Sequence, residues 1–133
     1  MAAFDMALPR SYCQRHAMAR EKLVVELKAE ELIAETARRL KLIREPCNAS
    51  IHLEKSADST YFNIGEGTVL FKPKLKASKY DIARAEANEV KRALRALVLK
   101  AKSTQDDVSV AEDLADCIIG MLTNMIKNLE DRM

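Results

Sequence analysis

Residues 110–129 carry the most regular pattern in the chain, because apolar residues recur there at spacings of three and four. Such spacing gives a helix one wide apolar face, which is unstable in contact with water. The face comprises Val110, Leu114, Cys117, Ile118, Met121, Leu122, Met125, Ile126 and Leu129. Other elements must cover this helix, so the pattern predicts a fold organised around the C-terminal helix.

Composition favours one mostly helical domain. A chain of 133 residues is long enough for a single hydrophobic core. Three Gly and three Pro leave little material for turns, and aromatic residues make up only 5% of the chain, which favours helices over a β-sandwich. No apolar run approaches the roughly 18 residues of a membrane span, so no membrane partner is expected. The net charge of +2 does not require a nucleic-acid partner either.

We expect a flexible arm over residues 1–8, followed by a single α+β domain over residues 9–133. Pro9 suits the first turn of a helix, and no Gly or Pro follows until Pro46. An unbroken helix from Pro9 to Arg44 would be about 50 Å long, which exceeds the width of a small domain. It therefore either breaks near residues 17–20 or pairs with another chain. The predicted oligomer or partner interface consists of Val25, Leu32, Leu40, Met121 and Met125.

Residues 51–71 predict a small three-stranded antiparallel meander. Ile51 and Leu53 alternate with polar neighbours, as in a half-buried strand. Further strands are expected over residues 60–64 and 68–71, joined by turns at residues 56–59 and at Gly65-Glu66-Gly67. This glycine pair lacks the spacing of a phosphate-binding loop, so a hairpin turn is the expected structure.

Two helices are expected after the meander. Ser78 followed by Asp81 resembles a capping box and begins a helix that reaches Lys102, whereas Ser109 and Glu112 form a clearer box for the last helix. The short connection predicts an antiparallel helix hairpin. Residues 71–102 hold ten Lys or Arg against three acids, and residues 103–133 hold two against seven. Charge pairing across the hairpin explains this distribution more simply than a nucleic-acid site does.

One basic segment is left outside that pairing. Its candidate nucleic-acid contacts are Lys72, Lys74, Lys76, Lys79 and Arg84, and the aromatic residues Phe71 and Tyr80 flank its lysines. Lysines beside aromatic rings can hold a single-stranded nucleic acid through charge and stacking. The same lysines can instead protect an exposed strand edge from aggregation, and this second explanation is favoured.

The sequence predicts no enzyme. Cys13, His16, Cys47 and His52 could form a metal site only if two separate regions met. No carboxylate pair or Cys–His pair with an orienting acid stands out. We therefore expect no catalytic residue, no metal and no cofactor. Three cysteines without paired spacing favour a reducing cytoplasm over a disulfide framework.

The cap of the last helix, Asp107-Val108-Ser109-Val110-Ala111-Glu112-Asp113-Leu114, follows a meander and a helix. This order resembles certain small phage- or prophage-encoded accessory proteins. The resemblance covers a little over half the chain and implies a non-enzymatic regulator or inhibitor that acts on a host protein or on a nucleic acid. It transfers no functional residue to this chain.

Together these observations predict a mostly helical α+β protein with a long N-terminal helix, a three-stranded meander and a C-terminal helix hairpin. The predicted function is that of a small cytoplasmic interaction or regulatory protein, which forms a homodimer or larger homo-oligomer and binds a partner macromolecule. The alternative is a nucleic-acid-binding module that uses the basic segment 72–84.

Overall fold

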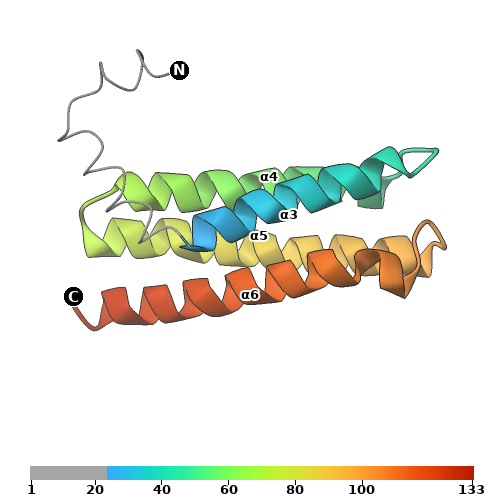
Figure 1. The fold of residues 1–133 in the computed structure, drawn as a ribbon. Coiled ribbons are helices and arrows are strands. Elements are labelled where there is room, and N and C mark those ends of the chain that lie inside the picture. Colours follow the sequence, from blue (N-terminus) through green and yellow to red (C-terminus); the bar gives the residue numbers. More distant parts are fainter. Residues whose placement is uncertain (1–23) are drawn as a thin grey trace, which may run out of the picture.

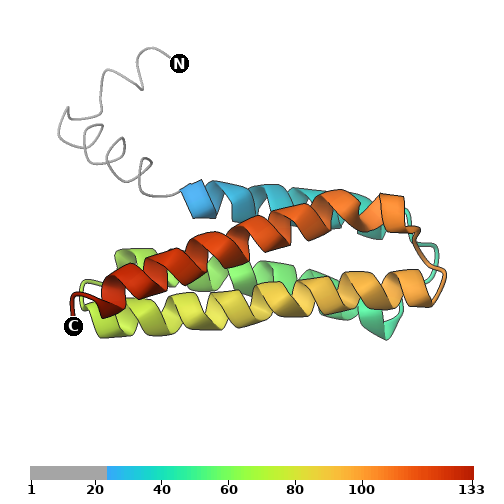
Figure 2. The same cartoon turned by 90° about the horizontal axis from the view of Figure 1, so that it is seen from below.

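The computed structural model describes residues 24–133, which form four helices and no strand. These are α3 (Val24–Lys41), α4 (Asn48–Val69), α5 (Pro73–Leu99) and α6 (Gln105–Glu130). Consecutive helices run antiparallel, and each packs against two others, in the cyclic order α3, α4, α5, α6 (Figure 1, Figure 2). The described chain is thus an up-down-up-down four-helix bundle. None of these four helices is long and apolar enough to cross a membrane.

The predicted α+β fold is wrong, because α4 replaces the meander over residues 51–71. The alternation at Ile51 and Leu53 lasts only four residues, whereas the buried positions of α4 recur every three or four residues along its whole length. Most of these buried residues are small. The full set is Ala49, Ser50, Leu53, Ser56, Ala57, Thr60, Ile64 and Gly67. Such a face is helical in period but weakly apolar, so the pattern of large residues obscured it. The expected turn at Gly65-Glu66-Gly67 lies inside the helix.

The helix hairpin of α5 and α6 is confirmed, although both helices begin earlier than predicted. α5 begins at Pro73 instead of Ser78. Proline suits the first turn of a helix, because the N–H that it lacks would have no partner within the helix. Before α6, the Thr104 hydroxyl accepts a hydrogen bond from the Asp107 N–H at 3.1 Å. The Asp107 carboxylate accepts one from the Thr104 N–H at 3.0 Å. This capping box begins the helix five residues before the predicted box at Ser109.

The core is closely packed because small residues line the contact between α4 and α5. Gly67 makes the closest approach, since a methyl group on its Cα would lie 2.6 and 2.8 Å from two ring carbons of buried Tyr80. Larger side chains fill the remainder of the core, among them Leu32, Leu53, Leu94, Ile118 and Leu122. The cyclic bundle therefore covers most of the apolar stripe of the last helix within one chain, although Val110 at its start is exposed.

Two predictions for the N-terminus fall partly or wholly outside the described residues. The arm over residues 1–8 lies outside them, as does the part of the Pro9–Arg44 helix before Val24. Within the described residues, α3 ends at Lys41, three residues before Arg44. The described part of α3 spans 18 residues, and the other three helices have 22 to 27.

Candidate interaction surface

The basic residues predicted to contact a nucleic acid are largely engaged with other groups of the bundle. The Lys76 ammonium donates hydrogen bonds to the carbonyl oxygens of Gly67 and Thr68, at 2.7 and 3.0 Å. Lys79 forms an ion pair with Glu66 at 2.7 Å, and Arg84 forms one with Asp81 at 2.6 Å.

Two lysines of the predicted set remain to be placed. Lys72 occupies the N-cap position of α5 without a capping hydrogen bond from its side chain, and Lys74 lies exposed in the first turn. Over its 27 residues α5 makes several turns, so the five predicted cations project in different directions around it. The structure does not bring them together into one continuous basic face.

The apolar residues predicted to form an interface lie in or against the core. Val25 and Leu32 are buried, with 2% and 0% of their surface exposed. Leu40, Met121 and Met125 are partly buried and pack against the same core. These residues stabilise the bundle from within, and they do not share one exposed face.

A different apolar surface lies on the outside of the α4–α5 hairpin. The ion pair between Glu66 and Lys79 fixes which sides of the two helices meet there. Because the helices are antiparallel, Phe62 and Ile82 lie about one turn from the ion pair in one direction, and Val69 and Leu75 about one turn in the other. We call these four apolar residues, with Glu66 and Lys79 between them, the hairpin patch.

The hairpin patch is well exposed. Phe62 and Val69 expose 62% and 73% of their surface, and Leu75 and Ile82 expose nearly half. Phe71, in the loop between the two helices, is almost fully exposed. The Phe62 ring packs edge-on against the Tyr61 ring, with centroids 5.6 Å apart. The Tyr61 hydroxyl in turn donates a hydrogen bond to Glu30 on α3 at 3.2 Å, so the aromatic part of the patch is held against the bundle.

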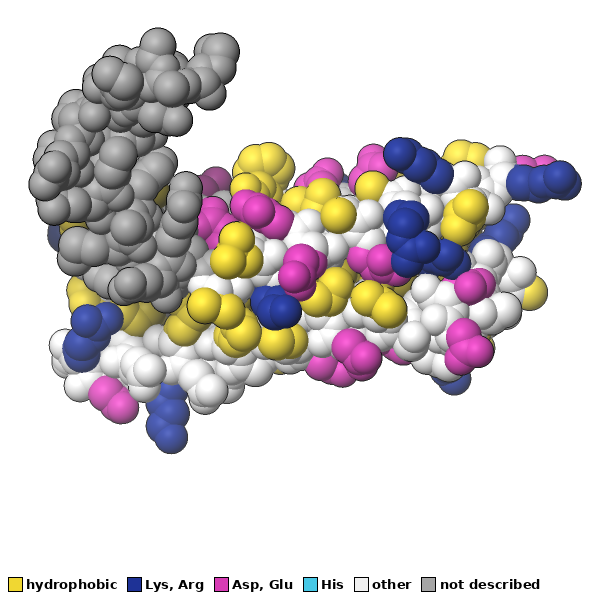
Figure 3. Space-filling view, in the orientation of Figure 1, with side chains coloured by type: hydrophobic (Ala, Val, Ile, Leu, Met, Phe, Trp, Pro, Cys, Tyr) yellow, Lys and Arg dark blue, Asp and Glu magenta, His cyan; other side chains and the backbone are white. Residues whose placement is uncertain are grey.

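The face with α3 at its centre has a different character. In Figure 3, apolar side chains on this face are separated by acidic and basic ones. A shallow groove between α3 and α6 is lined by Ala34, Val110 and Leu114 together with Glu31, Glu35 and Arg38. Arg38 forms an ion pair with Glu35 at 2.7 Å. Val110 is 52% exposed, comparable to Phe62, so it offers a matched position on another face.

The predicted charge pairing across the α5–α6 hairpin is found at one position. Lys91 on α5 forms an ion pair with Asp116 on α6 at 2.6 Å. Asp107, the capping residue of α6, instead pairs with Arg39 of α3 at 3.1 Å. The hydrogen bond from the Thr104 N–H, followed by the hydrogen bond with the Thr104 side chain and the charge of Arg39, holds the pKa of the Asp107 carboxyl below its ordinary value.

Within residues 24–133, no group of three or more His, Cys, Asp or Glu side chains could hold a metal ion. Cys13 and His16 of the considered metal set lie outside this range. Cys47 and Cys117 are free thiols, each partly exposed. Sequence reasoning missed the hairpin patch because it placed Phe62 and Val69 in strands. A helical period over residues 62–69 would have placed both residues on one face.

No family model matches the chain, and no curated protein matches it. A solved structure with the same arrangement is a protein of unknown function from the S23 ribosomal protein family of Bacteroides thetaiotaomicron. The two structures superpose with a TM-score of 0.74 and share 23% sequence identity, over 78% of this chain and 99% of that one. At this identity the likeness concerns the fold alone, and about a fifth of this chain has no counterpart in the match.

Proposed function

We propose that this protein is a small, non-enzymatic cytoplasmic interaction protein that forms a homodimer through the hairpin patch and presents the dimer to a partner macromolecule. The observation that carries the proposal is the exposure of Phe62, Val69, Leu75 and Ile82 on one face of one hairpin. Large apolar side chains that gather on a surface are typical of interaction sites. The free thiols Cys47 and Cys117 are consistent with a reducing compartment.

A second copy of the chain fits this patch better than a strongly charged partner does. A two-fold interface uses the same surface on both subunits, so the surface must be self-complementary. The hairpin patch meets this condition, because Glu66 and Lys79 supply one charge of each sign between apolar residues. In a dimer, Lys79 of one subunit can pair with Glu66 of the other while the apolar residues on both sides are buried.

The test is light scattering of the purified chain over a range of concentrations. Phe62→Ser and Ile82→Ser should each weaken the dimer about a hundredfold or more, because the substitution is present in both subunits and each copy removes an apolar contact worth about 1.5–3 kcal/mol. Val110→Ser is the matched control, since Val110 is similarly exposed on another face. A protein that remains monomeric at high concentration would refute the proposal, as would equal effects of all three substitutions.

A nucleic-acid-binding protein gives a different outcome in the same experiment. A monomer that co-elutes with a short RNA or DNA only at low salt would favour the basic segment over the patch. Lys72→Glu and Lys74→Glu would then abolish co-elution, because these two exposed lysines lie outside the ion pairs of α5. A dimer unaffected by nucleic acid and by these substitutions supports the proposal.

A further inference from the structure

A pocket of about 270 Å³ lies between the start of α4 and the C-terminal part of α5. It is at the end of the bundle that carries the α3–α4 and α5–α6 loops (Figure 1, Figure 2). Buried Ala49 and Ala93 line its inner wall. Polar side chains from both helices complete the lining: Asn48 and His52 from α4, and Glu89, Arg92 and Lys100 from α5 and its C-cap.

The two cations of this pocket differ from several others on α5 in having no partner. Lys79, Arg84 and Lys91 each form an ion pair with a carboxylate at 2.6 or 2.7 Å. Within residues 24–133, no hydrogen bond or ion pair engages the side chain of Arg92 or of Lys100. Two charged donors therefore border the pocket with their hydrogen-bonding capacity unused by the described chain.

The charge of Lys100 reaches the start of α4. The pKa of the Cys47 thiol, at the N-cap position of α4, is lowered first by the hydrogen bond from the Ser50 N–H and also by the charge of Lys100. The N-terminus of a helix adds a partial positive charge of its own. Among the described residues that line the pocket, Glu89 is the only acid. The balance of charge around this small space is therefore positive.

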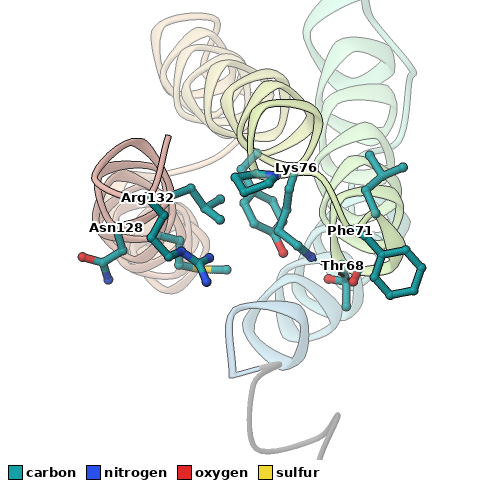
Figure 4. A pocket seen from close by; sticks show the side chains of 10 residues that line it. Thr68, Phe71, Lys76, Asn128 and Arg132 are labelled. Carbon is teal, nitrogen blue, oxygen red and sulfur yellow. Dashed lines mark hydrogen bonds between the residues drawn. The ribbon is translucent and has the colours of Figure 1, made fainter.

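A larger pocket at the opposite end of the α4–α5 hairpin is built differently. Its volume is about 560 Å³, and Lys76 and Arg132 are among its lining residues (Figure 4). The Lys76 ammonium is directed toward Thr68 and donates to the carbonyl oxygens of Gly67 and Thr68. The backbone at the end of α4 thus holds this cation, so the smaller pocket is the stronger candidate for an anion.

The donors of the smaller pocket match a phosphate group. Arg92 offers a planar fork of N–H donors that can bind two oxygens at once, and Lys100 offers an ammonium on a flexible stem. His52 and the amide of Asn48 can donate from the α4 side. A phosphate group has three or more oxygens for donors on both helices, whereas a carboxylate has two. The volume lies near the lower limit of small-molecule sites, which is about 300 Å³, so the occupant is small.

We propose that this pocket binds a phosphate group, either as the free ion or as the end of a small phosphate monoester. Arg92 and Lys100 bind the phosphate oxygens from α5, and His52 and Asn48 bind them from α4. Glu89 opposes the anion and lowers the affinity. The inference goes beyond the proposed dimer and does not depend on it, because none of these residues belongs to the hairpin patch.

The experiment is a titration of the isotope-labelled full-length chain, followed by two-dimensional proton–nitrogen NMR. The probes are sodium phosphate and glycerol phosphate at constant pH and ionic strength, with sodium chloride as the reference. We expect saturable shifts of the amides of residues 48–52 and 89–100, with a Kd in the millimolar range. A lower Kd for glycerol phosphate would identify a monoester as the ligand, and a lower Kd for sodium phosphate would identify the free ion.

Substitutions assign the binding to the pocket. Arg92→Ala and Lys100→Ala should each raise the Kd about tenfold, because each removes a charge-assisted hydrogen bond. Lys127→Ala is the matched control, since Lys127 is exposed on α6 and lines a different groove; it should change the Kd less than about twofold. Glu89→Gln removes the opposing charge and should lower the Kd about two- to fivefold.

Three outcomes would overturn the proposal. The first is the absence of saturable shifts at the pocket amides with either probe. The second is an equal effect of Lys100→Ala and Lys127→Ala, which would show attraction by net charge alone. The third is a short single-stranded RNA that shifts the same amides at far lower concentration, with an affinity that rises with its length, because this would identify a polyanion as the ligand. Dimerisation through the hairpin patch is measured separately, so its failure and the failure of this site are distinguishable.

Discussion

Gly67 is the position where the structure makes its sharpest prediction about stability. It lies in the last turn of α4, in helical conformation, and faces Tyr80, which is only 4% exposed. A Cβ at this position would lie 2.6 and 2.8 Å from two ring carbons of Tyr80 and 3.2 Å from the Cβ of Lys79. Because the ring is packed within the core, it cannot move aside without displacing other side chains.

Two opposing effects determine the result of Gly67→Ala. Replacing a helical glycine with alanine ordinarily stabilises a helix by about 0.5–1 kcal/mol. Forcing an extra methyl group into a filled core costs about 1–3 kcal/mol. We therefore expect Gly67→Ala to lower the free energy of unfolding by about 1–2 kcal/mol. For a bundle of this size, that corresponds to a loss of about 5–10 °C in Tm.

The chain provides two matched controls. A Cβ on Gly65 would lie 3.8 Å from Glu26 Oε1, which is an ordinary contact, and a Cβ on Gly120 would meet nothing within 4 Å. Gly65→Ala and Gly120→Ala should each raise stability by about 0.5–1 kcal/mol. Urea unfolding, followed by circular dichroism at 222 nm, measures all three variants under one set of conditions.

A double-mutant cycle identifies the ring as the cause. Tyr80→Leu removes the ring, so Gly67→Ala should become neutral or stabilising in that background, with a coupling energy of about 1–3 kcal/mol. An increase in stability for Gly67→Ala in the wild-type background would refute the close approach of α4 and α5. The same conclusion would follow from a loss of stability that Tyr80→Leu leaves unchanged.

Three further substitutions test local features of the bundle. Ala101 has a φ of 58°, and its N–H and that of Lys102 bond back into the last turn of α5, so Ala101→Gly should stabilise the protein by about 0.5–1 kcal/mol in thermal unfolding; an unchanged Tm would contradict the strained geometry. The pKa of Asp107 is lowered from its ordinary value of 3.8, first by the Thr104 N–H, so its contribution is present above that value and is lost as the pH falls through the lower folded pKa. Asp107→Asn should therefore destabilise the bundle at pH 7, and the difference should shrink in acid titrations followed by circular dichroism. Burial, followed by repulsion from Glu30, raises the pKa of Glu26, so the charged form opposes folding at neutral pH; Glu26→Gln should raise urea resistance at pH 7, and the gain should disappear below the ordinary pKa, where both states are protonated.

The sequence allowed correct prediction of those helices whose buried faces contain large apolar residues. Val90, Leu94 and Leu97 on α5, and Ile118 and Leu122 on α6, recur at helical spacing and are buried as expected. The hairpin that they form was predicted from the same spacing and from the short connection. Large side chains carry most of the hydrophobic signal, so the helical period is visible wherever they define the core.

The same reasoning failed where the core is built from small or polar residues. Ser56 and Thr60 of α4 are buried, and the Thr60 hydroxyl donates to the Ser56 carbonyl oxygen at 2.8 Å. The Thr60 hydroxyl finds its hydrogen-bond acceptor inside the helix. Residues of this kind can therefore lie on a buried face, although the sequence pattern marks them as polar. The predicted start of α6 at Ser109 was also wrong. Two capping-box patterns, one beginning at Thr104 and one at Ser109, lie five residues apart in the sequence. No local feature of the sequence shows that the helix begins at the first of them.

The outward position of the large residues on α4 connects the fold to its proposed function. An amphipathic helix normally buries its large apolar side chains and exposes its polar ones. On α4, Ala57 and Gly67 face the core, whereas Phe62 and Val69 face outward. Small residues inside allow α5 to approach closely, and Leu53 and Ile64 supply the large apolar side chains that α4 adds to the core. The exposed Phe62 therefore adds no core packing to the isolated chain. Its burial against a second surface would lower the free energy of the complex. For this reason we assign the interface to the hairpin patch rather than to the stripe of the last helix, which α3 and α5 already cover.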